Sequence, residues 1–521
     1  MFTSSLARRL SYKRRYQHQR WLRTPRPPVR IAISCIAALT ALIALSTLAA
    51  PRLAGEPAPA PEAQITVDAA KITGPVNRLI FGHNIEAADP YGIFSDQHRP
   101  SNTGHGFWDP RTRTFVARAI AAAEAVNIGA LRYPGGSLAN NHDWRKTVGP
   151  LSGRPAFQFG VDEYIALCRR LGAEPVFTVS DYALPADEMP AHAAALVEYL
   201  NAPAIPAHPW AMKRAAWGNP EPYGVKWFEL GNETSFGNHH SKHDLIPLRR
   251  YTPEQYVDYA RDCAAAMRAI DPAIKIGVVT VPGDARNIDL EWNRVLFRDA
   301  VPFADFVVLH FYTPGISNNP PDTRAALQAC LAVGDQLAAR LAQYRAAIRA
   351  ASGRDLPLAL TEYNIGAIQD HPFPFRYSFA AGLFSTDFIC LCLQPENGVM
   401  LANYWQLING YWGAIRTAEG GFTERATYPL FRLLGQHTEK LLLATDVRTP
   451  RGTFPGFSGV NATLGDHPSP TRPLQNLTLP SPLLARPVKS GTCEITATDD
   501  GILTVRLNGL DKSSYPVLFK L

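Results

Sequence analysis

The feature that most constrains the fold is an alternation of short apolar runs with longer amphipathic segments along most of the chain. The apolar runs are rich in Val, Ile, Leu and Phe, which is typical of strands buried on both faces of a parallel sheet. Eight such runs separated by helical segments predict an α/β protein with a closed (β/α)8 TIM barrel. The predicted strands are Leu79–Gly82, Ala130–Tyr133, Pro175–Val179, Val225–Leu230, Ile274–Val279, Phe306–Phe311, Leu356–Leu360 and Val399–Tyr404.

The amphipathic segments between these runs predict helices with recognisable ends. The clearest start is at Thr252, an N-cap residue followed by Pro253 in the first helical position and Glu254 in the first turn. The predicted helices include Arg111–Val126, Val161–Leu171, Pro253–Ile270, Thr323–Ala351 and Tyr377–Leu393.

The chain changes character on both sides of the predicted barrel, which spans residues 64–437. A Pro-, Gly- and Ser-rich stretch at 449–487 precedes alternating runs that are typical of short strands, with Asp499-Asp500-Gly501 as a hairpin turn. We therefore expect residues 438–521 to form a small C-terminal all-β module, β-sandwich-like, completed by a strand at 64–69.

The N-terminal part has three sections: a basic tail at 1–30, an uncharged apolar run at 31–50 and a Pro/Ala-rich linker at 51–63. Twenty apolar residues suffice to cross a bilayer, and the basic side stays in the cytoplasm. We expect a membrane anchor with the barrel outside the cytoplasm, periplasmic or extracellular. A cleaved signal peptide, giving a secreted protein, is the alternative.

The net charge of +7 is a property of the tail. Residues 1–30 hold nine of the 52 basic residues and no acidic one, which leaves 43 basic against 45 acidic residues in the remainder. The charge thus gives no argument for a nucleic-acid partner. Seven cysteines without a CxxC pair or zinc spacing predict mainly buried free thiols. A single disulfide is the alternative if the protein is exported.

Two predicted strands end in a carboxylate: Glu233 follows Leu230-Gly231-Asn232, and Glu362 follows Leu360-Thr361. In a parallel barrel the carboxyl ends of the strands form the active-site face. Two carboxylates there are the minimum equipment for cutting a glycosidic bond with retention, one as acid/base and one as nucleophile.

Other polar residues stand at the same ends of the predicted strands. The Gly135-Gly136 pair allows a tight turn close to a ligand. The remaining candidates are Glu86, Arg132, Trp144, Asn232, His310, Tyr312 and Gln406.

These motifs, in this order, resemble glycoside hydrolase clan A and, within it, the α-L-arabinofuranosidases of family 51, over roughly residues 64–440. The resemblance rests on Phe81-Gly82-x-x-x-Glu86, on Arg132-x-Pro134-Gly135-Gly136 with Trp144 and Gly149-Pro150, on Gly231-Asn232-Glu233, on His310-x-Tyr312, on Glu362-x-Asn364 and on Gln406-x-x-Asn409.

The resemblance implies a role for each matched residue. Glu233 would be the acid/base, Glu362 the nucleophile, and Asn232 would bind the hydroxyl next to the anomeric carbon. Arg132 would keep the nucleophile ionised, since a guanidinium lowers the pKa of a nearby carboxyl. Glu86, Tyr312 and Gln406 would line the sugar subsite. The chemistry needs no cofactor and no metal, and family members often assemble into homo-oligomers.

The chain departs from the family at Asn84, Ala87 and Ser137, where the family usually has an aromatic residue, a histidine and an asparagine. The segment 234–238 after the acid/base is also unusual. These departures leave the sugar and the linkage open.

Several alternatives stand beside this interpretation. Glu229 shares a strand face with Glu233 and could compete with it, although a buried ion pair is the simpler role. The cluster His239, His240, His243 and Asp244 could bind a metal or simply be solvated. Trp405, Tyr411 and Trp412 could stack on sugar rings or pack in the core.

The predicted function is retaining hydrolysis of an oligo- or polysaccharide by double displacement with two glutamates, with the α-L-arabinofuranosidase-like activity that the resemblance implies. Another clan A glycosidase, endo- or exo-acting, that processes a cell-surface polysaccharide is the second hypothesis. A carbohydrate-binding protein without catalysis is the third.

Overall fold

The structure is a computed structural model. It describes residues 63–87, 104–238, 248–281, 288–316, 323–366, 375–409, 413–417 and 422–448, together with four short strands beyond residue 448.

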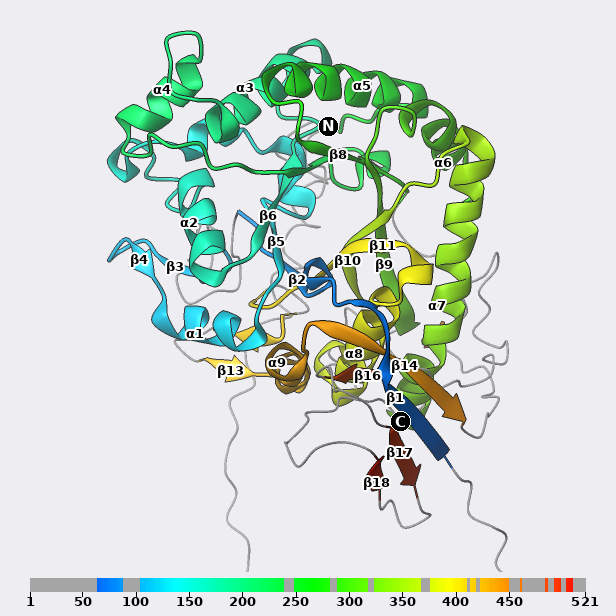
Figure 1. Cartoon of the computed structure of the whole chain (residues 1–521). Coiled ribbons are helices and arrows are strands. Elements are labelled where there is room, and N and C mark those ends of the chain that lie inside the picture. Colours follow the sequence, from blue (N-terminus) through cyan, green and yellow to red (C-terminus); the bar gives the residue numbers. More distant parts are fainter. Residues whose placement is uncertain are drawn as a thin grey trace, which may run out of the picture. The chain divides into compact units, whose positions relative to one another are not determined.

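Eight parallel strands close into a barrel, as predicted (Figure 1). Each strand pairs with its neighbour in chain order, β11 pairs with β2, and β10 pairs with both β9 and β11, which closes the ring. The strands are β2 (Gly82–Asn84), β5 (Ala130–Tyr133), β6 (Glu174–Val179), β7 (Trp227–Leu230), β8 (Lys275–Val279), β9 (Phe306–Ile316), β10 (Leu358–Gly366) and β11 (Val399–Tyr404).

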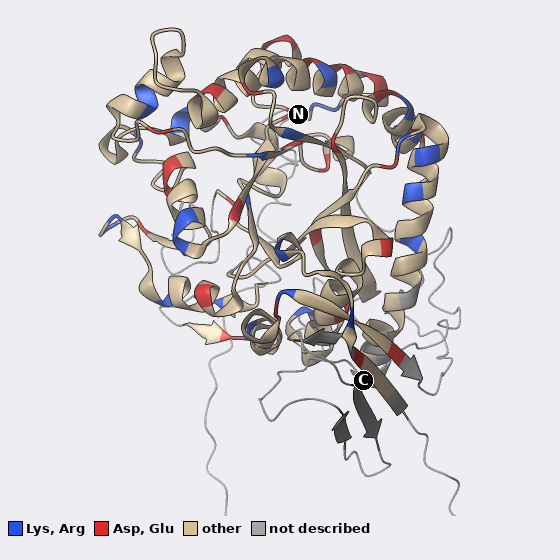
Figure 2. Ribbon diagram, viewed as in Figure 1, with Lys and Arg blue, Asp and Glu red and all other residues tan. Residues whose placement is uncertain are grey.

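Helices surround the strands (Figure 1). Acidic and basic residues are interspersed along the outer helices, with both signs on α5 (Figure 2). The helices are α1 (Ala117–Val126), α2 (Val161–Leu171), α3 (Met189–Asn201), α4 (Pro209–Ala216), α5 (Pro253–Ile270), α6 (Glu291–Val295), α7 (Thr323–Ser352), α8 (Phe379–Cys392) and α9 (Thr427–His437).

The predicted strands fit closely except the first and the ends of two others: β9 and β10 run on to Ile316 and Gly366, past the predicted ends Phe311 and Leu360, so Glu362 lies inside β10. Arg78–Ile80 forms a 3-10 turn, because the Asn77 side chain accepts a hydrogen bond from the Leu79 N–H, and the strand begins only at Gly82. The predicted strand Leu79–Gly82 was therefore misplaced along the chain, because the strand runs from Gly82 to Asn84.

Two predicted helices begin later than expected. Ahead of α1, the strands β3 (Trp108–Asp109) and β4 (Thr114–Phe115) pair with each other, so residues 111–116 are not helical. Ahead of α8, Ser378 accepts from the Ala381 N–H and caps the helix. Helices α3, α4, α6 and α9 were not among the predicted ones named above.

Helix α5 positions two strands of the barrel. Thr252 and Gln255 form a reciprocal capping box at its start, as the sequence indicated for Thr252. The Tyr256 hydroxyl donates to the Leu230 carbonyl at 2.9 Å and accepts from the Val279 N–H at 2.7 Å. The ends of β7 and β8 are thereby tied to one helix.

A second, antiparallel sheet contains β1 (Ala63–Pro75), which pairs with β14 (Leu441–Arg448) and β17 (Thr492–Ala497). Strands β16 (Leu483–Ala485) and β18 (Leu503–Asn508) form its edges. A two-residue strand, β15 (Val460–Asn461), pairs with β9. Most of 449–521 lies outside the described residues, so the C-terminal module at 438–521 stays a prediction.

The basic tail, the apolar run at 31–50 and the linker, save Ala63, also lie outside the described residues. Within the part that the structure describes, no helix is long and apolar enough to cross a membrane. The cysteines at 168, 263, 330, 390 and 392 are buried free thiols, as predicted.

Candidate active site

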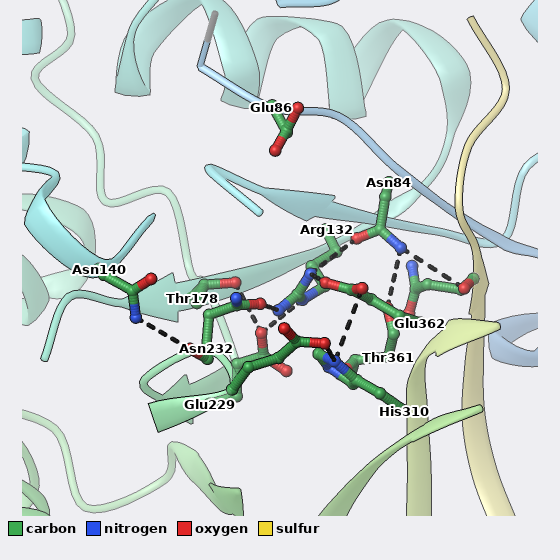
Figure 3. Close-up of polar contacts among 12 residues, drawn as sticks. Asn84, Glu86, Arg132, Asn140, Thr178, Glu229, Asn232, His310, Thr361 and Glu362 are labelled. Atoms are coloured by element: carbon green, nitrogen blue, oxygen red, sulfur yellow. Dashed lines mark hydrogen bonds and ion pairs between the residues drawn. The ribbon is translucent and has the colours of Figure 1, made fainter. Parts of the chain in front are cut away.

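The guanidinium of Arg132 organises the carboxyl ends of the strands (Figure 3). Arg132 lies on β5, is fully buried, and donates from Nη1 to Glu362 Oε1 at 2.9 Å and from Nη2 to Asn232 Oδ1 at 2.7 Å. It also donates from Nη1 to Asn84 Oδ1 at 3.2 Å. One planar cation therefore fixes side chains from β2, β10 and the loop after β7.

Glu229 is the counter-ion of this arginine. Its carboxylate is fully buried on β7, is paired with Arg132 Nε, and accepts from the Thr178 hydroxyl at 2.7 Å. A carboxylate held this way is part of the structural ion-pair network. The arrangement favours a buried ion pair over a catalytic role for Glu229.

Glu233 and Glu362 come together at one ring nitrogen of His310. His310 Nδ1 lies 3.1 Å from Glu233 Oε1 and 3.6 Å from Glu362 Oε2. Its Nε2 lies 3.0 Å from the Thr361 hydroxyl, which orients the ring. One carboxylate oxygen of each glutamate and one ring nitrogen lie within 4.8 Å of one another.

The two glutamates differ in exposure and in support. The Glu362 side chain is 5% exposed and that of Glu233 is 18% exposed. Tyr312 donates from its hydroxyl to Glu362 Oε2 at 2.6 Å, so both oxygens of Glu362 are held by donors. Glu362 is thus the fixed, enclosed carboxylate, and Glu233 is the more accessible one.

Burial raises the pKa of Glu362, while His310 and Arg132 lower it and Glu233 raises it further; the resulting pKa lies above the usual range. Arg132 thus lowers the pKa of Glu362, as expected for a guanidinium beside a carboxyl, although desolvation outweighs it. Burial also lowers the pKa of His310, but the carboxylates of Glu362 and Glu233 outweigh it and leave that pKa raised.

The subsite residues predicted from the sequence lie around this pair. Glu86 Oε2 is 3.1 Å from His105 Nε2. A Cβ at Gly136 would come within 2.2 Å of Glu86 Oε1 and 2.5 Å of Trp405, so the turn at Gly136 brings Glu86 and Trp405 against the backbone. Trp405 is itself largely buried.

Two buried amides have polar atoms without a partner among the described residues: Nδ2 of Asn232, and both Oε1 and Nε2 of Gln406. Buried amide groups are normally hydrogen-bonded, so such atoms at a barrel mouth are candidates for ligand contacts.

Trp144 has a different environment from the one predicted. It is 1% exposed, packs against Trp210 with ring centroids 4.8 Å apart, and donates from its indole N–H to the His192 carbonyl at 3.2 Å. Its polar atom is satisfied within the core, so we assign it to packing instead of substrate contact. His239, His240, His243 and Asp244, like Tyr411 and Trp412, lie outside the described residues.

Sequence reasoning missed His105 and Thr361, and it noted Asn84 only as a departure from the family. No spacing signal marks His105, which contacts Glu86 from 19 positions away. Asn84 donates to the Thr361 carbonyl at 2.8 Å, so it supports β10 beside Glu362.

Glu233, His310 and Glu362 also have the residue types and the proximity to hold a metal ion. However, the Arg132 guanidinium already occupies one oxygen of Glu362 at 2.9 Å. A fixed positive charge at that distance disfavours a divalent cation in the same place.

A closed parallel barrel that presents two neighbouring carboxylates at its strand ends has the architecture of a glycoside hydrolase. Residues 122–313 match the family model described as the alpha-L-arabinofuranosidase 1 domain. The predicted resemblance to the family 51 α-L-arabinofuranosidases is thereby confirmed, and the sequence relatives agree with it.

Among sequence relatives, the chain is 29% identical over 266 residues to an intracellular exo-α-(1→5)-L-arabinofuranosidase of Streptomyces lividans, covering 48% of this chain and 37% of the relative. It is 31% identical over 248 residues to a probable α-L-arabinofuranosidase C of Aspergillus clavatus, covering 44% of this chain and 45% of the relative. The chain thus spans less than half of the length of these two relatives.

Solved structures share the fold. The arabinose complex of an α-L-arabinofuranosidase from Thermotoga maritima superposes with a TM-score of 0.63 at 24% identity, covering 85% of this chain and 84% of that one. A GH51 α-L-arabinofuranosidase from Thermotoga petrophila gives a TM-score of 0.62 at 22% identity, covering 88% and 98%.

Proposed function

We propose that this protein is a retaining O-glycosyl hydrolase of the α-L-arabinofuranosidase type, with Glu362 as nucleophile and Glu233 as acid/base. The observation that carries the proposal is the pair of carboxylates whose oxygens lie within 4.8 Å of each other at the barrel mouth. Retaining enzymes hold their two carboxyls about 5–5.5 Å apart, whereas inverting enzymes leave about 6.5–9.5 Å for a water molecule.

The surroundings of each glutamate support its role. A nucleophile must be held rigidly with a lone pair directed at the anomeric carbon, and Arg132 and Tyr312 hold both oxygens of Glu362. An acid/base must exchange its proton with the leaving group and then with water, which suits the more exposed Glu233.

The reaction then proceeds in two displacements. Glu362 forms a bond to the anomeric carbon while the glycosidic C–O bond breaks, and Glu233 gives its proton to the leaving oxygen. In the second step Glu233 takes a proton from water, the water oxygen bonds to the anomeric carbon, and the bond to Glu362 breaks. Both glutamates return to their starting protonation states.

The unpartnered amide atoms support a sugar ligand at the same place. Asn232 Nδ2 can donate to a ring hydroxyl while its Oδ1 stays on Arg132, and Gln406 offers both a donor and an acceptor. The arabinofuranosidase activity of the relatives favours an L-arabinofuranosyl group. The substrate proposed here is an oligo- or polysaccharide that bears such groups.

A panel of nitrophenyl glycosides tests this function. We expect hydrolysis of the α-L-arabinofuranoside, and we expect Glu362→Ala to lower kcat by about 10³-fold or more. Asp305→Asn is the matched control, because Asp305 precedes β9 at the opposite end of the barrel, where it pairs with Arg268. Full activity of Glu362→Ala would overturn the assignment, and hydrolysis of a different glycoside alone would overturn the sugar.

We propose further that the catalytic domain is exported. The support is the uncharged run at 31–50 behind nine basic residues. Protease added to cells whose outer membrane, where present, has been permeabilised should then degrade the barrel, while a cytoplasmic marker protein stays intact. Protection of the barrel in these cells, with degradation only after the cytoplasmic membrane is broken, would contradict export.

A further inference from the structure

Asp181 is a buried carboxylate behind the acid/base that the mechanism above does not use. It follows β6, it is fully buried, and it lies against the turn from Gly231 to Thr234 that carries Glu233. We propose that Asp181 is a positioning residue, which holds Glu233 in the geometry needed for proton transfer. This inference rests on the role proposed for Glu233.

The hydrogen bonds to Asp181 come from neutral donors on two other loops. The Thr234 hydroxyl donates to Asp181 Oδ2 at 2.6 Å. The Asn140 amide donates to Oδ1 at 2.9 Å and to Oδ2 at 3.1 Å, and it reaches the Asn232 carbonyl at 2.8 Å. Asp181 therefore joins the residues on both sides of Glu233 to the loop after β5.

The turn has a conformation that needs such support. Glu233 has φ 47° and ψ 36°, in the left-handed region that residues with a side chain rarely adopt. Gly231 has φ 97°, and a Cβ there would come within 2.2 Å of the Thr234 hydroxyl and 2.9 Å of Asp181 Oδ2. The turn is thus closed directly onto the Asp181 carboxylate. Disfavoured conformations persist where surrounding contacts over-determine them.

The backbone on both sides is tied down as well. The Tyr251 hydroxyl donates to the Asp181 carbonyl at 2.9 Å, and the Tyr182 hydroxyl donates to the Thr234 carbonyl at 3.1 Å. Neither end of the Asp181–Thr234 contact can shift without breaking a second hydrogen bond.

A carboxylate is the side chain that this place requires. Thr234, Asn140 and backbone N–H groups all direct hydrogens at Asp181, and the ionised carboxylate can accept at every one of these contacts. An asparagine would turn an NH2 group toward one of these donors and break at least one contact. Burial raises the pKa of Asp181 to about 7, which shows that keeping the charge here is unfavourable and points to a role at the site.

Leaving-group dependence separates positioning of the acid from a general loss of structure. A good leaving group such as dinitrophenolate departs without a proton, whereas phenol or a sugar needs one. For Asp181→Asn in the full chain, we expect near-normal kcat/KM, which reports the first displacement, on dinitrophenyl α-L-arabinofuranoside. On the phenyl arabinofuranoside we expect a loss of about tenfold or more, part of the 10²–10⁴ that general acid catalysis contributes.

Asp305→Asn serves as the control, because it removes a partly buried carboxylate from the other end of the barrel and should slow both substrates equally or neither. If Asp181→Asn does not fold, Thr234→Val removes only the hydroxyl contact and should show the same selective loss. An equal effect of either variant on both leaving groups would overturn the proposal.

A crystal structure of Asp181→Asn decides the positioning role without relying on turnover. We expect Glu233 to leave its left-handed conformation and its carboxylate to move from its 3.1 Å contact with His310. An unmoved Glu233 would refute the positioning role, whatever the kinetics. Inactivity of the wild-type chain on all arabinofuranosides would instead contradict the proposed function.

Discussion

At the scale of single residues, the geometry of the site depends on one buried cation. Arg132 neutralises Glu229 and contacts Glu362, and both carboxylates are almost completely enclosed. Removing one partner of a buried charge network leaves the others without compensation, which costs far more than the network contributes when intact. The catalytic geometry and the stability of the barrel therefore share this residue.

Arg132→Met should lower the free energy of unfolding by about 3–5 kcal/mol, since two buried carboxylates lose their cation. Urea denaturation followed by tryptophan fluorescence measures this change. Arg261→Met, on the exposed face of α5, is the control and should leave the midpoint unchanged. A stable Arg132→Met protein would mean that Glu229 and Glu362 are not held as charges.

The pH dependence of stability should report Asp181. Its pKa is raised from 3.8 to about 7 in the folded protein, so the folded state keeps a proton that the unfolded state loses. This group therefore destabilises the fold progressively as the pH rises from 3.8 towards about 7, with no further change above that.

Removing the titrating group should flatten that profile. Asp181→Asn should show a less negative slope of unfolding free energy against pH over this interval than the wild type, as measured by urea titrations. Identical slopes for the two proteins would show that Asp181 keeps an ordinary pKa in the fold.

At the scale of elements, the sequence predicted the barrel well because buried parallel strands leave a direct signal. Ala130–Tyr133 and Val399–Tyr404 match β5 and β11 to the residue, and Pro253–Ile270 matches α5. The strand at Gly82–Asn84 was displaced, because a local side-chain cap at Asn77 competes with the apolar pattern of residues 79–82.

The site was predicted less completely than the strands that carry it. Glu233 closely follows β7 and Glu362 lies in β10, so their positions follow from the strands of the barrel. The contacts of Asp181, His105 and Trp144 depend on how loops fold over the mouth, and loop geometry has no periodic signal in a sequence. Trp144 is an example, because an aromatic residue near a site is as often packed in the core as exposed to a ligand.

The capping box of α5 gives a test at this scale. Thr252→Ala should lower the free energy of unfolding by about 1 kcal/mol, because the Gln255 N–H loses its acceptor. Thr252→Ser keeps the hydroxyl and should restore most of the stability. Both can be compared by thermal or urea unfolding, and equal stability of all three proteins would show that the cap contributes nothing.

At the scale of the whole molecule, the barrel fold is shared by enzymes of many activities, whereas the residues at its mouth suit only a few types of reaction. The fold alone does not define an activity. The proposal of a retaining glycosidase rests on the two glutamates, on the arginine between the strands, and on the amide atoms of Asn232 and Gln406 that have no partner among the described residues. The match to the arabinofuranosidase domain model adds the sugar to that proposal.

The central claim is that Glu362 forms a covalent bond with the sugar, and trapping that bond tests it most directly. Glu233→Ala incubated with dinitrophenyl α-L-arabinofuranoside should form the intermediate without acid help and hydrolyse it slowly without a base. Mass spectrometry of the digested protein should then find one arabinosyl group on the peptide that contains Glu362. A label on any other residue, or product of inverted configuration with no label, would contradict the account.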